Sequence, residues 1–137
     1  MTTEKFILPP KPDGDSAPYW EYLRKHQAHL QKCSKCGRLR FPPYPSCPYC
    51  GTFGGEWTPI STRCKLYSWT VIQHPVDPRL AAEVPFIVAL VELEEGVHII
   101  GRLLGIEPDK LKGDMPVKVR YDDIDDAFTL INFEPAA

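Results

Sequence analysis

The sequence predicts a mainly β protein with an N-terminal helix, in which a four-cysteine zinc ribbon precedes a five-stranded barrel. Three observations predict this class. Two Cys-x-x-Cys-Gly pairs lie ten residues apart between Cys33 and Gly51. Apolar residues ahead of these pairs recur at helical spacing. The residues after them form five segments typical of β-strands, with one short helical insertion.

The first part of the chain is an arm followed by a helix. Residues 1–15 are rich in Pro, Asp and Lys, and we expect them to form a flexible arm. Residues 16–31 are expected to form a helix, because Pro18 suits a first turn and the apolar side chains that follow share one face. These apolar residues are Tyr19, Trp20, Leu23 and Leu30.

The second part, residues 32–58, is predicted to be a zinc ribbon. Its cysteines form two pairs, Cys33/Cys36 and Cys47/Cys50. Each pair presents two thiolates, and four thiolates are the soft ligands that a tetrahedral Zn²⁺ ion takes. Gly37 and Gly51 let the backbone turn tightly around the sulfur atoms. Four cysteines leave no position for water, so we expect a structural zinc, with iron or a redox dithiol as alternatives.

The third part, residues 59–137, is predicted to be an OB-fold domain. Its strand-like segments are rich in β-branched, aromatic or alternating residues and span 65–72, 86–93, 97–104, 117–121 and 127–133. A short turn containing Gly96 joins the second and third segments. A helical turn from Pro108 to Gly113 separates the third from the fourth. Five strands with this one helical insertion match a Greek-key barrel of the OB type.

Composition and charge exclude several classes of protein. The net charge of −2 gives no strong field towards nucleic acid or an anionic membrane. The N-terminus lacks the apolar segment of a secretory signal, and the longest apolar run is too short to cross a bilayer. We therefore expect a soluble, cytoplasmic protein that does not bind a membrane. An odd number of cysteines in a reducing compartment fits a metal site better than disulfides.

Two features near the cysteines suggest a binding surface. Four cations surround the first pair, namely Lys32, Lys35, Arg38 and Arg40. They either offset the formal −2 charge of zinc held by four thiolates, or bind phosphate of a nucleic acid or nucleotide cofactor. The stiff, proline-rich segment RFPPYP (Arg40–Pro45) has two interpretations. It either docks a partner at little entropic cost or packs the ribbon on the barrel. The candidate binding residues are Arg38, Arg40, Phe41, Pro42, Pro43 and Tyr44.

No catalytic residues are predicted from spacing. The histidines are scattered, at His26, His29, His74 and His98. No Ser-His-Asp, Cys-His or paired-carboxylate arrangement is indicated. Cys64 follows Arg63, whose charge would lower the pKa of the thiol, but a lone cysteine beside a strand is typical of packing.

In this order, the helix, the ribbon and the barrel resemble a known family, domain of unknown function 35. That family joins a rubredoxin-like zinc ribbon to an acyl-CoA-associated OB fold. The resemblance extends from about Tyr19 to Pro135. It is carried by Trp57 and by the segments PYWEYL, CSKCGRLRFPPYPSCPYCG, LYSWTVI, VPFIVALVELEEGVHIIGRLLGI and DMPVKVRYDD. One departure is STRC, at Ser61–Cys64, where many members have a Gly-rich segment.

The resemblance implies a non-catalytic accessory subunit. Members pair with thiolase-like proteins that carry the catalytic cysteine and histidine, and some pair with acyl-CoA hydratases or aldolases of steroid side-chain degradation. This implies a hetero-oligomer in which the chain helps to form an acyl-CoA site. The reaction would be thiolytic or retro-aldol C–C cleavage of CoA thioesters, or condensation, with aromatic-compound degradation as another setting. The candidate binding residues would then contact the partner or CoA.

A single-stranded nucleic-acid-binding module is the alternative function. Zinc ribbons and OB folds both bind nucleic acid, and cations with aromatic residues form a plausible patch. The net charge of −2 and the acidic turn at Asp122–Asp126 argue against this function. A rubredoxin-like redox carrier would require iron.

Overall fold

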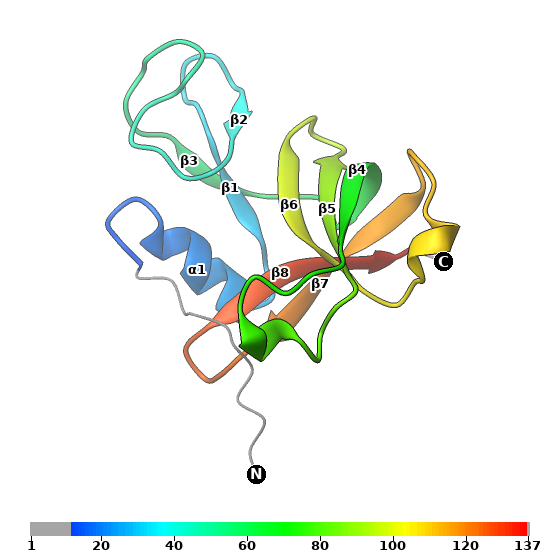
Figure 1. Ribbon diagram of the computed structural model, residues 1–137. Coiled ribbons are helices and arrows are strands. Elements are labelled where there is room, and N and C mark those ends of the chain that lie inside the picture. Colours follow the sequence, from blue (N-terminus) through cyan, green and yellow to red (C-terminus); the bar gives the residue numbers. More distant parts are fainter. Residues whose placement is uncertain (1–11, 137) are drawn as a thin grey trace.

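The computed structural model describes residues 12–136, in which a small three-stranded lobe and a barrel are both in contact with a short helix (Figure 1). The lobe contains β1 (His29–Lys32), β2 (Leu39–Arg40) and β3 (Glu56–Pro59). The helix is α1 (Ala17–Arg24). The barrel contains β4 (Arg63–Ile72), β5 (Phe86–Leu93), β6 (His98–Leu103), β7 (Pro116–Asp123) and β8 (Thr129–Pro135). Two 3₁₀ turns, η1 (Pro78–Leu80) and η2 (Pro108–Lys110), lie in its connections.

Strand pairing confirms the predicted fold class. The lobe is an antiparallel sheet with the order β2-β1-β3, and the barrel closes in the order β4-β5-β6-β8-β7. The insertion η2 falls between the third and fourth barrel strands, as predicted. The chain is therefore mainly β, with one short helix and a four-cysteine ribbon ahead of a closed five-stranded OB barrel.

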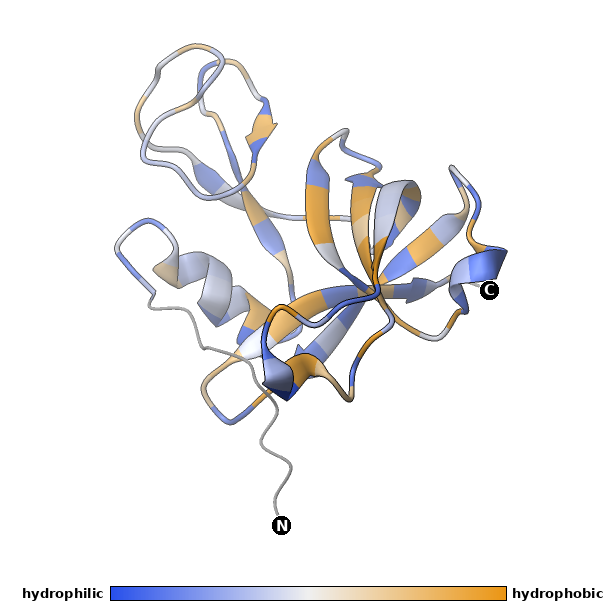
Figure 2. Cartoon of the chain, viewed as in Figure 1, coloured by the Kyte–Doolittle hydropathy of each residue, from blue (hydrophilic) through white to orange (hydrophobic). Residues whose placement is uncertain are grey.

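The barrel core follows from the alternation of side chains along each strand. Every second residue of β5, from Ile87 to Leu93, is buried, while the outward residues between them are half-buried. Figure 2 shows the hydrophobic residues concentrated on the barrel strands. Phe133 is 0% exposed, and its ring lies over Gly101. A Cβ at Gly101 would come within 2.9 Å of that ring, so glycine is required there.

The helix is shorter than the predicted span of 16–31. It ends at Arg24, and His26 has a left-handed backbone with φ of 57°. Residues 29–32 form β1, because their backbone pairs with β3 along its whole length. Leu30 is buried, as expected for an apolar residue here, but it reaches the core from a strand. Long-range pairing thus overrides the local helical spacing.

The predicted flexible arm falls mostly outside the described part of the chain, since residues 1–11 are not described. Its end is an ordered turn ahead of α1. The backbone N–H of Ser16 donates to Asp13 Oδ1 at 2.9 Å, and the N–H of Asp13 donates to Ser16 Oγ at 3.1 Å. No helix within residues 12–136 has the length and apolar character needed to span a membrane.

Aromatic contacts connect α1 to both parts of the protein. Tyr19 lies 5.6 Å from Phe41 of the ribbon, measured between ring centroids. Trp20 lies 5.3 Å from Phe128, which precedes β8. These contacts place the ribbon, and with it the four cysteines, at a defined position beside the barrel.

Candidate metal centre

Two turns of the same geometry present the cysteines. In the first turn, the N–H of Gly37 donates to the carbonyl of Cys33 at 3.0 Å. In the second, the N–H of Gly51 donates to the carbonyl of Cys47 at 2.9 Å. Both glycines have positive φ, 75° and 78°, which a residue with a Cβ adopts at a cost. The repeated Cys-x-x-Cys-Gly pattern therefore folds into two matching ligand turns, as predicted.

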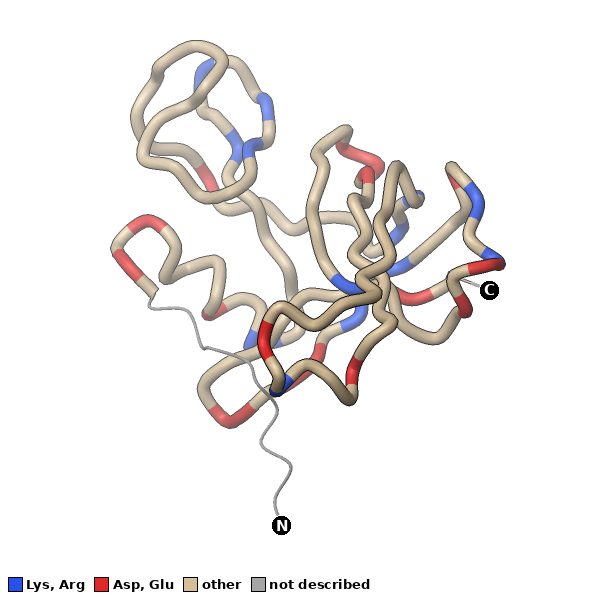
Figure 3. The backbone as a smooth tube through the Cα atoms, viewed as in Figure 1, with Lys and Arg blue, Asp and Glu red and all other residues tan. Residues whose placement is uncertain are grey.

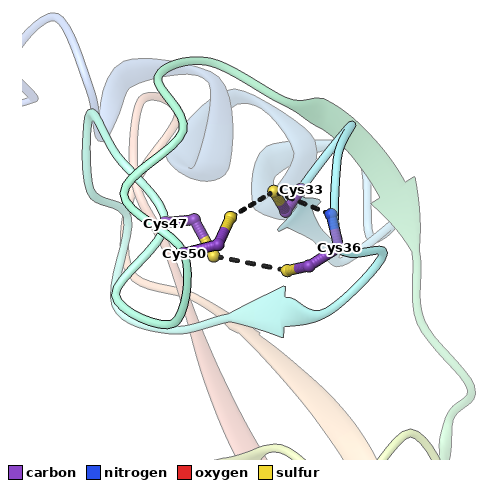
Figure 4. A group of neighbouring side chains, drawn as sticks. All are labelled: Cys33, Cys36, Cys47 and Cys50. Carbon is purple, nitrogen blue, oxygen red and sulfur yellow. Dashed lines mark hydrogen bonds between the residues drawn. The ribbon is translucent and has the colours of Figure 1, made fainter.

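The four sulfur atoms converge on one point (Figure 4). The Sγ atoms of Cys33 and Cys50 lie 3.6 Å apart, as do those of Cys36 and Cys47, and all four lie within 4.8 Å of one another. A tetrahedron of thiolates about 2.3 Å from a metal has edges of roughly 3.8 Å. A disulfide would require a separation of about 2.05 Å. The cysteines are therefore free thiols arranged as a four-ligand metal site.

Hydrogen bonds favour the thiolate form of two cysteines at this centre, Cys33 and Cys50. Backbone N–H groups of Cys36 and Lys35 each donate to Cys33 Sγ at 3.4 Å and lower the pKa of that thiol. Hydrogen bonding with Thr52, whose Oγ1 is 3.3 Å from Cys50 Sγ, lowers the pKa of Cys50 to about 6. The local backbone is thus already arranged for negatively charged sulfur, the form in which cysteine binds a metal ion.

The centre offers four protein ligands, which complete a tetrahedral coordination shell without water. Within residues 12–136, no histidine forms a hydrogen bond with a serine, threonine or cysteine side chain. His26 Nε2 lies 2.9 Å from Asp123 Oδ1, His29 Nδ1 lies 2.7 Å from the Gln27 carbonyl, and His98 pairs with a glutamate. The arrangement suits a structural metal site rather than a centre that activates a nucleophile.

Cys64 takes no part in the centre. It is buried in the barrel core, and its Sγ lies 3.4 Å from the Val117 carbonyl. Burial raises the pKa of this thiol to about 12. Any lowering of the pKa by the neighbouring Arg63 is therefore outweighed by loss of solvation, and the packing interpretation holds.

Arg40 lies inside the ribbon, although it was predicted as a binding residue. It is 3% exposed, and its Nε donates to Gln31 Oε1 at 3.2 Å. Its Nη2 donates to the carbonyls of Tyr44 at 3.1 Å and Gly54 at 2.9 Å. The guanidinium therefore ties β2 to the two loops that surround the metal centre, a role that sequence alone did not indicate.

The other predicted binding residues differ in exposure. Phe41 is half-buried against Tyr19, which favours the packing interpretation for its ring. Pro42 is exposed, Pro43 is half-buried, and Tyr44 is 44% exposed. Arg38 is exposed and lies over the ring of Tyr49, 4.6 Å from its centroid. The structure thus separates Arg38, on the surface, from Arg40 in the interior.

Sequence reasoning missed two exposed aromatic residues of the ribbon. Tyr49 is 59% exposed and Phe53 is 79% exposed. Both lie in or beside the second cysteine turn, where no strand or helix pattern assigns them to the core. The presence of aromatic residues in a loop without a strand or helix pattern could have indicated that these side chains are exposed.

Comparisons with known proteins agree with this geometry. Residues 30–54 match the family model described as the rubredoxin-like zinc ribbon domain of ChsH2, and residues 57–122 match the C-terminal OB-fold domain of ChsH2. A solved structure titled Ltp2-ChsH2(DUF35) aldolase superposes with a TM-score of 0.84 at 38% identity. That match covers 93% of this chain and 99% of the solved one.

Two curated relatives differ in how much of them the chain covers. It is 39% identical, over 94% of its length, to a probable enoyl-CoA hydratase alpha subunit of Thermomonospora curvata, but it spans 40% of that protein. It is 34% identical to a DUF35 domain-containing scaffold protein of Pyrococcus furiosus, with 74% of each chain covered. The chain therefore belongs to the DUF35 family, whose members join a rubredoxin-like zinc ribbon to an OB-fold domain.

Proposed function

We propose that the chain is a non-catalytic accessory subunit of a thiolase-like enzyme acting on CoA thioesters. It would bind the catalytic partner and help to form the acyl-CoA site for thiolytic or retro-aldol C–C cleavage, or for condensation. Relatives named as a scaffold protein, as a component of an aldolase and as a subunit of a CoA hydratase support an accessory role. The thiolase-like class of the partner follows from the family resemblance.

The closed metal centre is the observation that carries this proposal. Four thiolates fill a tetrahedral shell, so the metal has no vacant position at which to activate water or polarise a carbonyl. Zn²⁺ fits the donor set, because it favours tetrahedral sulfur coordination and has no redox chemistry. The centre would hold the ribbon in shape, and the bond-breaking residues would belong to the partner.

The exposed ribbon residues are the proposed contact with the partner. Tyr44 and Phe53 project from loops that the metal and Arg40 hold in place. Aromatic side chains on a rigid loop contribute much contact area at a small entropic cost, and aromatic residues are enriched in protein interfaces. Arg40 would act indirectly, by fixing these loops.

Affinity purification from the native host tests the accessory role. The tagged full chain should recover a thiolase-like protein in a fixed ratio, and the isolated complex should cleave or condense a CoA thioester. The double variant Tyr44→Ser/Phe53→Ser should keep its metal and fold but recover less of the partner. A matched control, Tyr67→Ser on β4, changes an exposed aromatic residue outside the ribbon. Recovery of the wild-type chain alone, at native expression levels, would contradict the proposal.

Metal analysis of freshly purified protein tests the identity of the ion. We expect one zinc per chain and no absorbance in the visible region. An iron-containing, coloured protein would instead indicate a rubredoxin-like electron carrier.

A further inference from the structure

The four cysteines of the metal centre differ in exposure, and each close contact between sulfur atoms joins unlike members. Cys33 and Cys47, which begin the two cysteine turns, are each 2% exposed, whereas Cys36 and Cys50, which end them, are exposed to solvent. The Sγ atoms lie 3.6 Å apart in the pairs Cys33–Cys50 and Cys36–Cys47. Each pair therefore places a cysteine that solvent reaches against one that is buried.

Both close pairs connect the first cysteine turn to the second (Figure 4). Their members are 17 and 11 residues apart in the chain, and the shorter loop lies inside the longer one. Two covalent cross-links with this nesting would hold the turns together as the metal does, because each would join one turn to the other. Cross-links within each Cys-x-x-Cys pair would leave the two turns unconnected. The sulfur contacts thus match the connectivity that a bound metal imposes.

We propose that the centre is a redox modification site, at which a hydroperoxide converts the metal-binding thiolates into the disulfides Cys33–Cys50 and Cys36–Cys47 and releases the ion. The thiolate is the form of cysteine that reacts with peroxide, and the sulfenic acid that results condenses with a neighbouring thiol to a disulfide. The ribbon is then held by a metal in one state and by disulfides in the other. This inference does not depend on the proposed accessory function.

The reaction of each pair begins at its exposed cysteine. The Cys50 thiolate attacks one oxygen of hydrogen peroxide, so an S–O bond forms, the O–O bond breaks, and the other oxygen leaves as water after protonation. The Cys33 thiolate then attacks the Cys50 sulfur, the S–O bond breaks, and a second water leaves. The sulfur atoms lose the two electrons that the peroxide gains. With the same steps at Cys36 and Cys47, two peroxides and four protons yield two disulfides, four waters and one free ion.

This oxidation also changes the charge of the ribbon. Residues 29–59 contain four cations and one acidic residue, Glu56, which gives a net charge of +3. Figure 3 shows that Lys and Arg outnumber Asp and Glu along this part of the backbone. A divalent ion with four thiolates adds a formal charge of −2, whereas disulfides are neutral. The net charge of the ribbon therefore rises from +1 to +3 when disulfides replace the metal.

The fifth cysteine, Cys64, provides an internal control. It is 8% exposed in the barrel core and lies outside the cluster of four sulfur atoms. Its Sγ lies 3.4 Å from the Val117 carbonyl oxygen, which cannot take part in a disulfide. Peroxide should therefore leave Cys64 as a thiol at a dose that oxidises the other four cysteines, and Cys64→Ala should respond as the wild type does.

Titration of the zinc-loaded full chain with hydrogen peroxide tests the site. Zinc release, followed with a chromogenic indicator, should be complete at about two equivalents of peroxide per ion. Peptide mapping by mass spectrometry, after free thiols are alkylated, should recover the disulfides Cys33–Cys50 and Cys36–Cys47. A dithiol reductant with added zinc should restore the metal centre. Retention of zinc, disulfides within the Cys-x-x-Cys pairs or between chains, or sulfinic acids in place of disulfides would each overturn the proposal.

Two further measurements distinguish the oxidised chain from one that has simply lost its metal. Amides of residues 29–59 should exchange about tenfold more slowly in the oxidised chain than in the chelated chain, because the disulfides keep the turns together. Capillary electrophoresis should show that the oxidised chain has gained about two positive charges relative to the zinc-loaded chain. Equal exchange in the oxidised and chelated chains, or a gain of negative charge on oxidation, would overturn the proposal that disulfides replace the metal.

Discussion

The ribbon and the barrel are held together by different means. In the barrel, a continuous core of aliphatic side chains and Phe133 is buried between five strands. In the ribbon, the strands β1, β2 and β3 are two to four residues long, and the loops between them depend on four thiolates and on Arg40. Stability in the barrel is thus spread over many contacts, while in the ribbon it is concentrated at two points. Single changes should therefore affect the two regions very differently.

Removal of the metal should give the largest effect and should be confined to the ribbon. Structural zinc sites contribute roughly 10–16 kcal/mol in peptides of this kind at pH 7. With a chelator or in Cys47→Ser, amide hydrogen exchange should show lost protection in residues 29–59 and retained protection in β5 and β8. Cys64→Ala, which removes a cysteine outside the centre, should keep the metal. Unfolding of the barrel together with the ribbon would contradict the separation of the two regions.

A cavity in the barrel should destabilise the barrel and leave the metal centre of the ribbon intact. Phe133→Ala removes a fully buried ring and should lower the free energy of unfolding by about 3–5 kcal/mol, measured by urea denaturation. Its metal content in native buffer should not change. Phe53→Ala, which truncates an exposed ring, should alter stability by less than about 0.5 kcal/mol. Metal loss from Phe133→Ala under native conditions would show that the regions are more strongly coupled than the contacts indicate.

The two arginines of the ribbon should differ despite their proximity in sequence. Arg40→Gln leaves the Tyr44 and Gly54 carbonyls without their donor and should destabilise the ribbon by roughly 2 kcal/mol. Competition with a chelator should reveal this as faster loss of metal. Arg38→Gln, at an exposed position, should release metal at the wild-type rate. Equal rates for the two variants would refute the structural role of Arg40.

Substitutions at the contact between α1 and the ribbon should have a smaller but measurable effect on the free energy of unfolding. A double-mutant cycle of Tyr19→Leu and Phe41→Leu should give a coupling energy of about 0.5–1.5 kcal/mol, as expected for a packed aromatic pair. The double variant should also show altered protection at the ribbon–barrel boundary. Additive effects of the two substitutions would indicate that the rings contribute independently.

The smallest effect is expected in acid, at the contact between His26, which follows α1, and Asp123 of the barrel. Hydrogen bonds from Thr129 and His26 lower the pKa of Asp123 below its ordinary value of 3.8. Its stabilisation is therefore present above pH 3.8 and is lost as the pH falls through the folded-state pKa. Asp123→Asn should reduce the loss of stability in acid, seen in urea midpoints on either side of that value. Asp126→Asn, in the same acidic turn, should follow the wild-type profile.

The sequence alone determined the four-cysteine cluster and the barrel. Two Cys-x-x-Cys-Gly repeats encode their turns locally, because the glycines supply positive φ and the backbone N–H groups lie next to the sulfur atoms. The barrel strands were predictable because alternation or apolar runs of about four to eight residues specify strands, and β5 keeps its predicted bounds of 86–93. These features need only near neighbours in the chain.

Tertiary structure decided those features that depend on residues far apart in the sequence. Residues 29–32 form β1 rather than helix because β3, more than 20 residues later, supplies their hydrogen-bond partners. Arg40 is buried because Gln31, Tyr44 and Gly54 converge on it from three segments, whereas Arg38, two residues away, has no such acceptors and stays exposed. A cleft lies where the ribbon faces the β5–β6 turn, with Arg38 and Tyr49 on one wall and Glu95 and Val97 on the other. Its walls come from segments far apart in the sequence, and no local pattern in the chain encodes that juxtaposition.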